Sequence, residues 1–171
     1  MSKLDFSLTG DQIKTLSEIN TDLCSENKMF RLLQGDVGSG KTIVSLLSAF
    51  NTINSGFQVA VMAPTEILAR QHFLLAKKIF PKNINIALIS GKSEYKVKKE
   101  ILLRLENNKI DIIFGTHAIF QKKVIFKKLG LIIIDEQHKF GVNQRKRLSD
   151  KGGPNCDVLL MTATPIPRTL T

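Results

Sequence analysis

The chain has 171 residues, of which 43% are hydrophobic and 23% are charged, and its formal net charge is +10. This length suits one well-buried domain rather than two, and the composition is ordinary for a soluble globular protein. Unbroken apolar runs such as residues 131–134 are too short to cross a bilayer, and residues 1–5 lack the apolar core of an export signal. We therefore expect a cytoplasmic protein without a membrane partner.

The charge and the cysteines bear on the partner and the compartment. A net charge of +10 fits a polyanionic partner such as a nucleic acid. A lysine-rich genome composition would produce the same excess, so charge alone leaves nucleic-acid binding open. Cys24 and Cys156 lie far apart and form no C-x-x-C pair, which favours two packing cysteines in a reducing compartment over a disulfide framework.

The first predicted element is a helix that begins after Thr9. Four apolar residues recur with helical spacing and define its inner face: Ile13, Leu16, Ile19 and Leu23. Thr9 and Gln12 have the spacing of a capping box. The Gln12 amide would also match the donor and acceptor on an adenine edge. From these residues alone the cap is the favoured interpretation.

Residues 35–42 match the phosphate-binding loop pattern G-x-x-x-x-G-K-[ST], between a predicted strand at 29–33 and a predicted helix at 41–54. The loop comprises Gly35, Asp36, Val37, Gly38, Ser39, Gly40, Lys41 and Thr42. Its glycines let backbone N–H groups turn toward a polyphosphate, and the helix N-terminus adds its dipole. Lys41 would reach the β- and γ-phosphates, and the Thr42 hydroxyl would bind Mg²⁺. A glycine-rich turn with a surface lysine is the weaker interpretation, because the whole pattern is matched at a strand-to-helix junction.

Strands and helices alternate along the rest of the chain. Gly56 would cap the helix at 41–54; the later strands are predicted at 57–63, 84–90, 110–115, 131–134 and 158–161, and the later helices at 65–80, 93–107 and 143–150. Most strands are continuous apolar runs, which is typical of a parallel sheet covered on both faces. We therefore predict a three-layer α/β fold with a mostly parallel sheet and helices on both faces. Ligands of such sheets bind at the carboxyl ends of the strands.

An acid pair, Asp135 and Glu136, directly follows the predicted strand at 131–134. Beside a phosphate loop, Asp135 would hold the Mg²⁺ shell in the Walker B role. Glu136 would orient or deprotonate an attacking water. Acidic residues are also common at helix N-termini that have no catalytic role. The pair therefore indicates a phosphoryl-transfer site only in combination with the complete phosphate loop.

The histidines do not form a recognisable metal site. His72, His117 and His138 have no H-E-x-x-H or Cys/His spacing. A structural or coupling role is the better interpretation of His138. No serine lies in a nucleophile elbow, so a catalytic triad is not indicated either.

With these motifs in place, the sequence resembles the motor of superfamily 2 helicases and, among them, a bacterial ATP-dependent DNA helicase that acts on branched DNA. The motifs are FSLTGDQ (6–12), similar to the adenine-reading Q motif; GDVGSGKT (35–42), motif I; APTEILARQH (63–72), motif Ia; GTHAIFQ (115–121), motif Ib; DEQHKFGVNQR (135–145), motif II with Lys139 where arginine is expected; and MTATPIPRTL (161–170), motif III. Their order and spacing match over almost the whole chain. DEQH with FGVNQR is the most specific element, because the related transcription-repair coupling translocase typically reads DEEH.

The resemblance implies a single RecA-like P-loop NTPase domain over residues 1–171, with ATP and Mg²⁺ as cofactors. Gln12 would read adenine, with Phe6 near it, which raises this role above the cap. Five residues would line the path of a DNA backbone: Pro64, Thr65, Gly91, Thr116 and His117. Three would couple the nucleotide state to that path: His138, Thr162 and Thr164. Ordinary helix capping is the alternative for Thr65 and Thr116.

The departures from the family pattern also shape the expectation. The sequence stops soon after motif III, so it holds no second RecA-like domain with an arginine finger and no wedge domain for branched DNA. An arginine supplied across the cleft is worth about 10³–10⁵ in rate. We therefore expect this chain alone to bind nucleotide, to bind DNA weakly and to be a poor ATPase. In the parent enzyme, ATP hydrolysis would be coupled to movement along branched DNA in recombination and repair.

Two other classes of function stay open from the sequence. One is a basic nucleic-acid-binding module with a vestigial phosphate loop, which the net charge of +10 would suit. The other is a small P-loop kinase, in which DEQH and the TAT segment would have no purpose.

Overall fold

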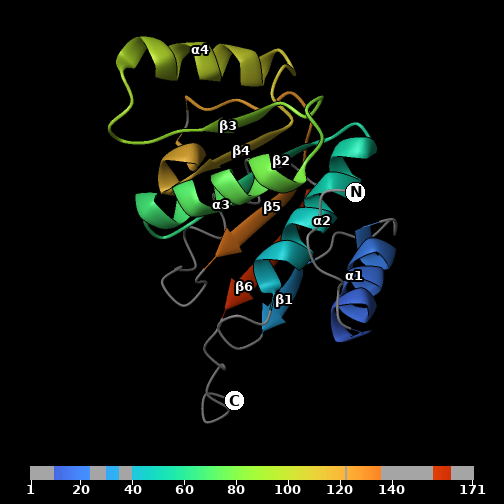
Figure 1. Ribbon diagram of the computed structural model, residues 1–171. Helices are drawn as coiled ribbons and strands as arrows, with labels where there is room; N and C mark the ends of the chain where they lie inside the picture. The colour runs from blue at the N-terminus through green and yellow to red at the C-terminus, as the bar shows by residue number, and fades with distance from the viewer. Residues whose placement is uncertain (1–9, 24–29, 35–39, 122, 136–155, 163–171) are drawn as a thin grey trace.

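The computed structural model describes residues 10–23, 30–34, 40–121, 123–135 and 156–162 (Figure 1). They form a six-stranded sheet with the strand order β1-β6-β5-β2-β4-β3, and every pairing between the described strands is parallel. The strands are β1 (Phe30–Gln34), β2 (Gln58–Met62), β3 (Ile86–Leu88), β4 (Ile112–Gly115), β5 (Leu129–Asp135) and β6 (Asp157–Thr162). The helices are α1 (Gly10–Leu23), α2 (Lys41–Asn54), α3 (Glu66–Ile79), α4 (Tyr95–Glu106) and the 3-10 helix η1 (His117–Phe120).

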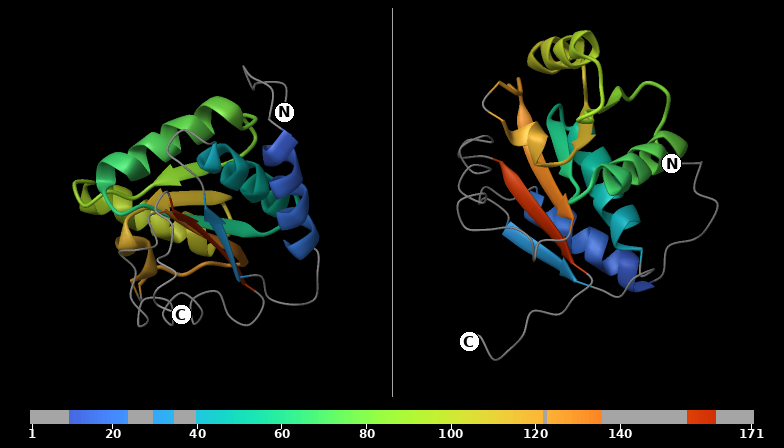
Figure 2. Two further views of the ribbon diagram at one scale, coloured as in Figure 1. Left: turned by 90° about the horizontal axis from the view of Figure 1, so that it is seen from below. Right: turned by 90° about the vertical axis from the view of Figure 1, so that its left-hand side faces the viewer.

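Helices cover both faces of the sheet. One core lies under α1, α2 and α3, which run together along one face (Figure 2), and the other lies under α4 and η1. Alternate residues of β2 enter opposite cores: Val59 and Val61 join the first, whereas Ala60 and Met62 join the second. Every residue of β2 is therefore buried, and each fully buried aliphatic side chain contributes about 1.5–3 kcal/mol to folding.

The ends of α2 and α3 follow from the residues at their termini. Gly40 precedes α2 with φ of 82° and Gly56 follows it with φ of 93°, both in the left-handed region that glycine adopts without a Cβ penalty. Thr65 caps α3, because its hydroxyl accepts the N–H of Leu68 at 3.2 Å. The Thr65 cap therefore starts α3 directly after the carboxyl end of β2.

The structure confirms the predicted parallel α/β fold, and each predicted strand is present. One core assignment is wrong: Ile13, expected on the inner face of the first helix, is 55% exposed. The helix packs against α2 further along, where Leu16 and Ile19 reach the core. Cys156 is buried, as expected for a packing cysteine.

Strand β3 is shorter than the predicted range 84–90. The Ile84 N–H closes a turn onto the Pro81 carbonyl at 3.1 Å, and the Asn85 N–H donates to the Asp111 carboxylate at 2.7 Å. These two N–H groups are therefore not available to the sheet. The short helix η1 was not expected, and the predicted helix at 143–150, Thr9 and Cys24 lie outside the described residues.

Candidate functional site

The carboxyl ends of the described strands lie at one edge of the sheet, because all the pairings are parallel. At that edge Gln34 of β1 pairs with Thr162 of β6, and Asp135 of β5 pairs with Met161 of β6. β6 lies between β1 and β5, so the ends of β1 and β5 are about 10 Å apart. The start of α2 lies at the same end of the sheet as the carboxyl end of β1 (Figure 1 and Figure 2), so the end of the predicted phosphate loop and the predicted acid belong to the same edge.

The start of α2 has the features of an anion site. Lys41 and Thr42 form its first turn, and both residues are partly buried. Gly40 has no side chain to cap the first-turn amides, and its carbonyl accepts the Val44 N–H at 3.1 Å. The first N–H groups of an α-helix have no partners within the helix. This N-terminus therefore suits negatively charged oxygens, which the helix dipole also favours.

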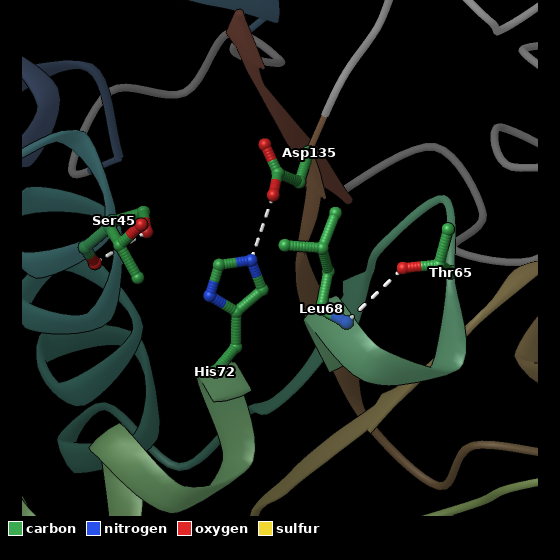
Figure 3. A network of polar contacts seen from close by, with 6 residues as sticks. Ser45, Thr65, Leu68, His72 and Asp135 are labelled. Carbon is green, nitrogen blue, oxygen red and sulfur yellow. Dashed lines mark hydrogen bonds and ion pairs between the residues drawn. The ribbon is translucent and has the colours of Figure 1, made fainter. Parts of the chain in front are cut away.

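Asp135 ends β5 and contacts a histidine from the helical layer. The Nε2 atom of His72 lies 2.8 Å from Oδ2 of Asp135 (Figure 3), and the two side chains are only 10% and 14% exposed. His72 belongs to the buried stripe of α3, together with Ala69, Ala76 and Ile79. Histidine spacing gave no sign of this contact. The sequence does place a polar residue on an otherwise apolar helix stripe. A polar side chain buried there needs a hydrogen-bond partner, so this pattern could have predicted that His72 has one.

The segments after β2 and β4 lie side by side. β2 lies between β5 and β4 in the sheet, and the Ala63 N–H extends the ladder by donating to the Gly115 carbonyl at 2.9 Å. This bond brings Pro64 next to Thr116, both of them partly buried. Two of the residues predicted to line a DNA path are thus neighbours, and Pro64 follows β2, which pairs with the strand that ends at Asp135.

The segment after β3 is joined to the start of α3. The Gly91 N–H donates to the Oε1 atom of Glu66, and the Gly91 carbonyl accepts a hydrogen bond from Lys98 at 3.2 Å. A Cβ at position 91 would lie 2.6 Å from that Glu66 oxygen, so glycine permits the close approach. Glu66 was not among the predicted site residues. Its bond brings Gly91 beside Thr65, the residue that caps the same helix.

The structure therefore brings together two groups of predicted site residues. The described members are Gly40, Lys41, Thr42, Asp135, Pro64, Thr65, Gly91 and Thr116. Gln12 lies in α1, His117 in η1 and Thr162 in β6, but their side chains are outside the described part. The remaining predicted site residues lie outside the described ranges: Phe6, Gly35, Asp36, Val37, Gly38, Ser39, Glu136, His138 and Thr164.

Within the described residues, no cluster of three or more His, Cys, Asp or Glu side chains forms a metal-binding group. Among the helices of the described ranges, none combines the length and the apolar character needed to cross a membrane.

Comparison with known proteins places this edge of the sheet in context. The DEAD/DEAH box helicase family model matches residues 9–171. The chain is 54% identical to the ATP-dependent DNA helicase RecG of Streptococcus pneumoniae, over 98% of this chain and 25% of that protein. It is 52% identical to RecG of Bacillus subtilis, over 99% of this chain and 25% of that protein. The chain thus spans about a quarter of the length of these relatives.

Solved structures give the same result. A structure of RecG bound to a three-way DNA junction matches 99% of this chain and 22% of that one, with a TM-score of 0.86 and 45% identity. The DEAD-box helicase Mss116 bound to single-stranded RNA matches 95% of this chain and 37% of that one, with a TM-score of 0.74. At 22% identity, the second match shows the fold alone. The predictions that the sequence belongs with the helicases and has a RecA-like fold are confirmed.

Proposed function

The chain belongs to the DEAD/DEAH box helicase family, which implies ATP binding, and we propose that it is the first RecA-like motor domain of a RecG-type DNA helicase. In this proposal ATP binding and hydrolysis are coupled, in the longer protein, to movement along branched DNA during recombination and repair. One observation supports this proposal. Lys41, Thr42, Asp135 and the segments that follow β2, β3 and β4 all lie at the same edge of the sheet.

The residues at this edge fit a Mg²⁺ ion held with the nucleotide. Thr42 offers a hydroxyl and Asp135 a carboxylate, the hard oxygen donors that Mg²⁺ prefers. Oδ2 of Asp135 is already bonded to His72, and Oδ1 points away from the imidazole ring (Figure 3). We assign Thr42 and Asp135 to the ion and its water shell. When bound, Mg²⁺ neutralises charge between the β- and γ-phosphates.

The other nucleotide contacts come from the same motifs. Lys41 and the first turn of α2 bind the phosphates, because the ammonium group and the helix dipole both favour negative charge there. Glu136, next to Asp135, orients the attacking water and accepts its proton. Gln12 reads the adenine edge, with Phe6 beside it.

The nucleic-acid contacts are proposed for the neighbouring loops. Pro64, Thr65, Gly91, Thr116 and His117 line the DNA backbone, and the similarity to RecG supports a branched substrate because that protein was solved on a three-way junction. His138, Thr162 and Thr164 transmit the nucleotide state to these loops. A second RecA-like domain, in the longer protein, completes the ATPase site.

The test is nucleotide binding by the Lys41→Ala variant. Binding of a fluorescent ATP analogue is measured by titration for this variant, for the unsubstituted chain and for the control Lys82→Ala. Lys82 is exposed and lies in the turn between α3 and β3, at the amino ends of the strands. We expect Lys41→Ala to lose binding by at least about 10-fold, since a lost charged contact costs about 1.5–3 kcal/mol. We expect Lys82→Ala to bind normally. Unchanged binding by Lys41→Ala would remove the proposal.

A DNA titration separates the motor from the two alternatives. For a motor domain, the affinity for a three-way junction should change when nucleotide is added. Affinity that ignores nucleotide and falls steeply with salt indicates a basic binding module. Phosphate transferred to a small acceptor, rather than released, indicates a kinase.

A further inference from the structure

The contact between His72 and Asp135 connects two elements that are far apart in the sequence. Nε2 of His72 and Oδ2 of Asp135 are 2.8 Å apart, although the residues are separated by 63 positions (Figure 3). Both side chains are largely removed from water, at 10% and 14% exposure. A polar pair this well buried is held by its own hydrogen bond rather than by solvent, so its loss is costly.

Both partners are fixed by the backbone that carries them. His72 lies on the buried stripe of α3, a helix that begins at the Thr65 cap and packs on the sheet. Asp135 lies in a central strand: β5 pairs with β6 on one side and with β2 on the other. The contact is therefore set by two packed elements and not by a mobile loop.

The chemistry of the pair assigns the hydrogen. An ionised carboxylate only accepts hydrogen bonds, so the imidazole must carry its proton on Nε2 to donate to Oδ2. The carboxylate is then held in one orientation, with Oδ1 directed away from the ring (Figure 3). Hydrogen-bond partners behind a metal-binding group orient it and tune its affinity.

We propose that His72 is a positioning residue for the nucleotide site, whose Nε2–H fixes the Asp135 carboxylate so that Oδ1 is presented to the Mg²⁺ shell. This inference rests on the proposed role of Asp135 in holding Mg²⁺ with the nucleotide. It adds to the site a residue of α3, the helix that starts at the segment proposed to line the DNA path. His72 acts through Asp135 and does not touch the nucleotide.

The experiment compares His72→Gln with His72→Asn. The Gln amide nitrogen has the same number of bonds from the backbone as the imidazole Nε2, whereas the Asn amide is one bond shorter and does not reach Oδ2. A fluorescent ADP analogue is titrated at a series of Mg²⁺ concentrations and again in EDTA, and thermal unfolding is recorded for each protein. We expect His72→Asn to raise the Mg²⁺ concentration for half-maximal binding by about 10-fold or more. We expect His72→Gln to restore the unsubstituted value, and both variants to bind ADP normally in EDTA.

Other outcomes would contradict the inference in distinct ways. An unchanged Mg²⁺ dependence in His72→Asn overturns the positioning role, while the proposed function stands if Lys41→Ala still loses binding. Equal losses in the Gln and Asn variants, or a loss that persists in EDTA, show a packing role and also overturn it. Absence of nucleotide binding by the unsubstituted chain overturns both.

A measurement on the unsubstituted chain covers the case in which His72→Asn fails to fold. The sequence has 3 histidines, so the side-chain ¹⁵N signals of His72 can be assigned by comparison with His117 and His138 variants. Long-range ¹H–¹⁵N correlation spectra distinguish the two imidazole tautomers. We expect protonation at Nε2. The tautomer protonated at Nδ1 alone cannot donate to Oδ2 and would contradict the proposal.

Discussion

The replacement of Gln58 by leucine should expose how the amino end of β2 is held. Gln58 is only 1% exposed, and its amide binds three backbone groups from different segments. Its Nε2 donates to the carbonyls of Leu105 and Ile110, each at 2.9 Å, and its Oε1 accepts the Lys128 N–H at 3.0 Å. Leucine has a similar volume but no polar atoms, so the substitution removes all three bonds while leaving little empty space.

The expected loss of stability depends on which hydrogen bonds each of these backbone groups keeps after the substitution. The Leu105 carbonyl still accepts the Asn108 N–H at 3.2 Å, so its loss is the smallest. Ile110 is buried, and its carbonyl loses a partner away from water, which costs about 1–3 kcal/mol. Lys128 is exposed, so its N–H can turn to solvent and loses about 1 kcal/mol or less. Together with a small gain from burying an apolar side chain, we expect a net destabilisation of about 3 kcal/mol.

Urea unfolding followed by circular dichroism measures this change. For a domain of this size, about 3 kcal/mol corresponds to a fall in Tm of about 6–12 °C. Gln71→Leu, the same substitution at an exposed position of α3, is the control and should change stability by less than about 0.5 kcal/mol. A Gln58→Leu variant within about 1 kcal/mol of the unsubstituted chain would refute the reasoning that these three bonds hold the strand end.

Two further substitutions test local features by the same unfolding assay. Thr65→Ala removes the cap on the Leu68 N–H and should cost about 1 kcal/mol, whereas Thr65→Ser keeps the hydroxyl and should cost little; equal effects would show that the cap does not matter. Gly130→Ala places a Cβ 2.6 Å from the Cβ of Phe57 and should cost about 1–3 kcal/mol. Gly10→Ala, where nothing lies within 4 Å, should be neutral or stabilise by about 0.4–1 kcal/mol, and a similar loss at both glycines would contradict the steric explanation.

The sequence predicts the elements well because their signals are local. Continuous apolar runs indicate buried parallel strands, and the glycines at 40 and 56 and the cap at Thr65 mark helix ends within a few residues of the elements they bound. Exposure is harder to predict, as Ile13 shows: helical spacing defines a face, but the position of the neighbouring helix decides how much of that face is covered.

The pairwise contacts of the site depend on the order of the strands, which no local pattern encodes. Asp135 is recognisable from its place after an apolar run, but its bond to His72 requires β5 to lie beside β2 in the sheet. The bond between Glu66 and Gly91 likewise depends on how β3 and α3 are placed. Buried polar residues on apolar stripes, such as His72 and Gln58, show that a partner is needed without showing which one it is.

The position of β2 gives α3 a special place in the fold. β2 lies between β5, which ends at Asp135, and β4, which leads to Thr116, and α3 starts from the segment that follows β2. The same helix therefore binds Asp135 through His72 and Gly91 through Glu66. A shift of α3 along the sheet cannot keep both bonds unless Asp135 or the segment after β3 shifts with it.

A hydrogen bond to a charged group is worth about 1.5–3 kcal/mol, the same range as typical coupling free energies between sites of about 1–3 kcal/mol. The His72–Asp135 bond is thus strong enough to carry a substantial part of any coupling between the nucleotide and the proposed DNA path.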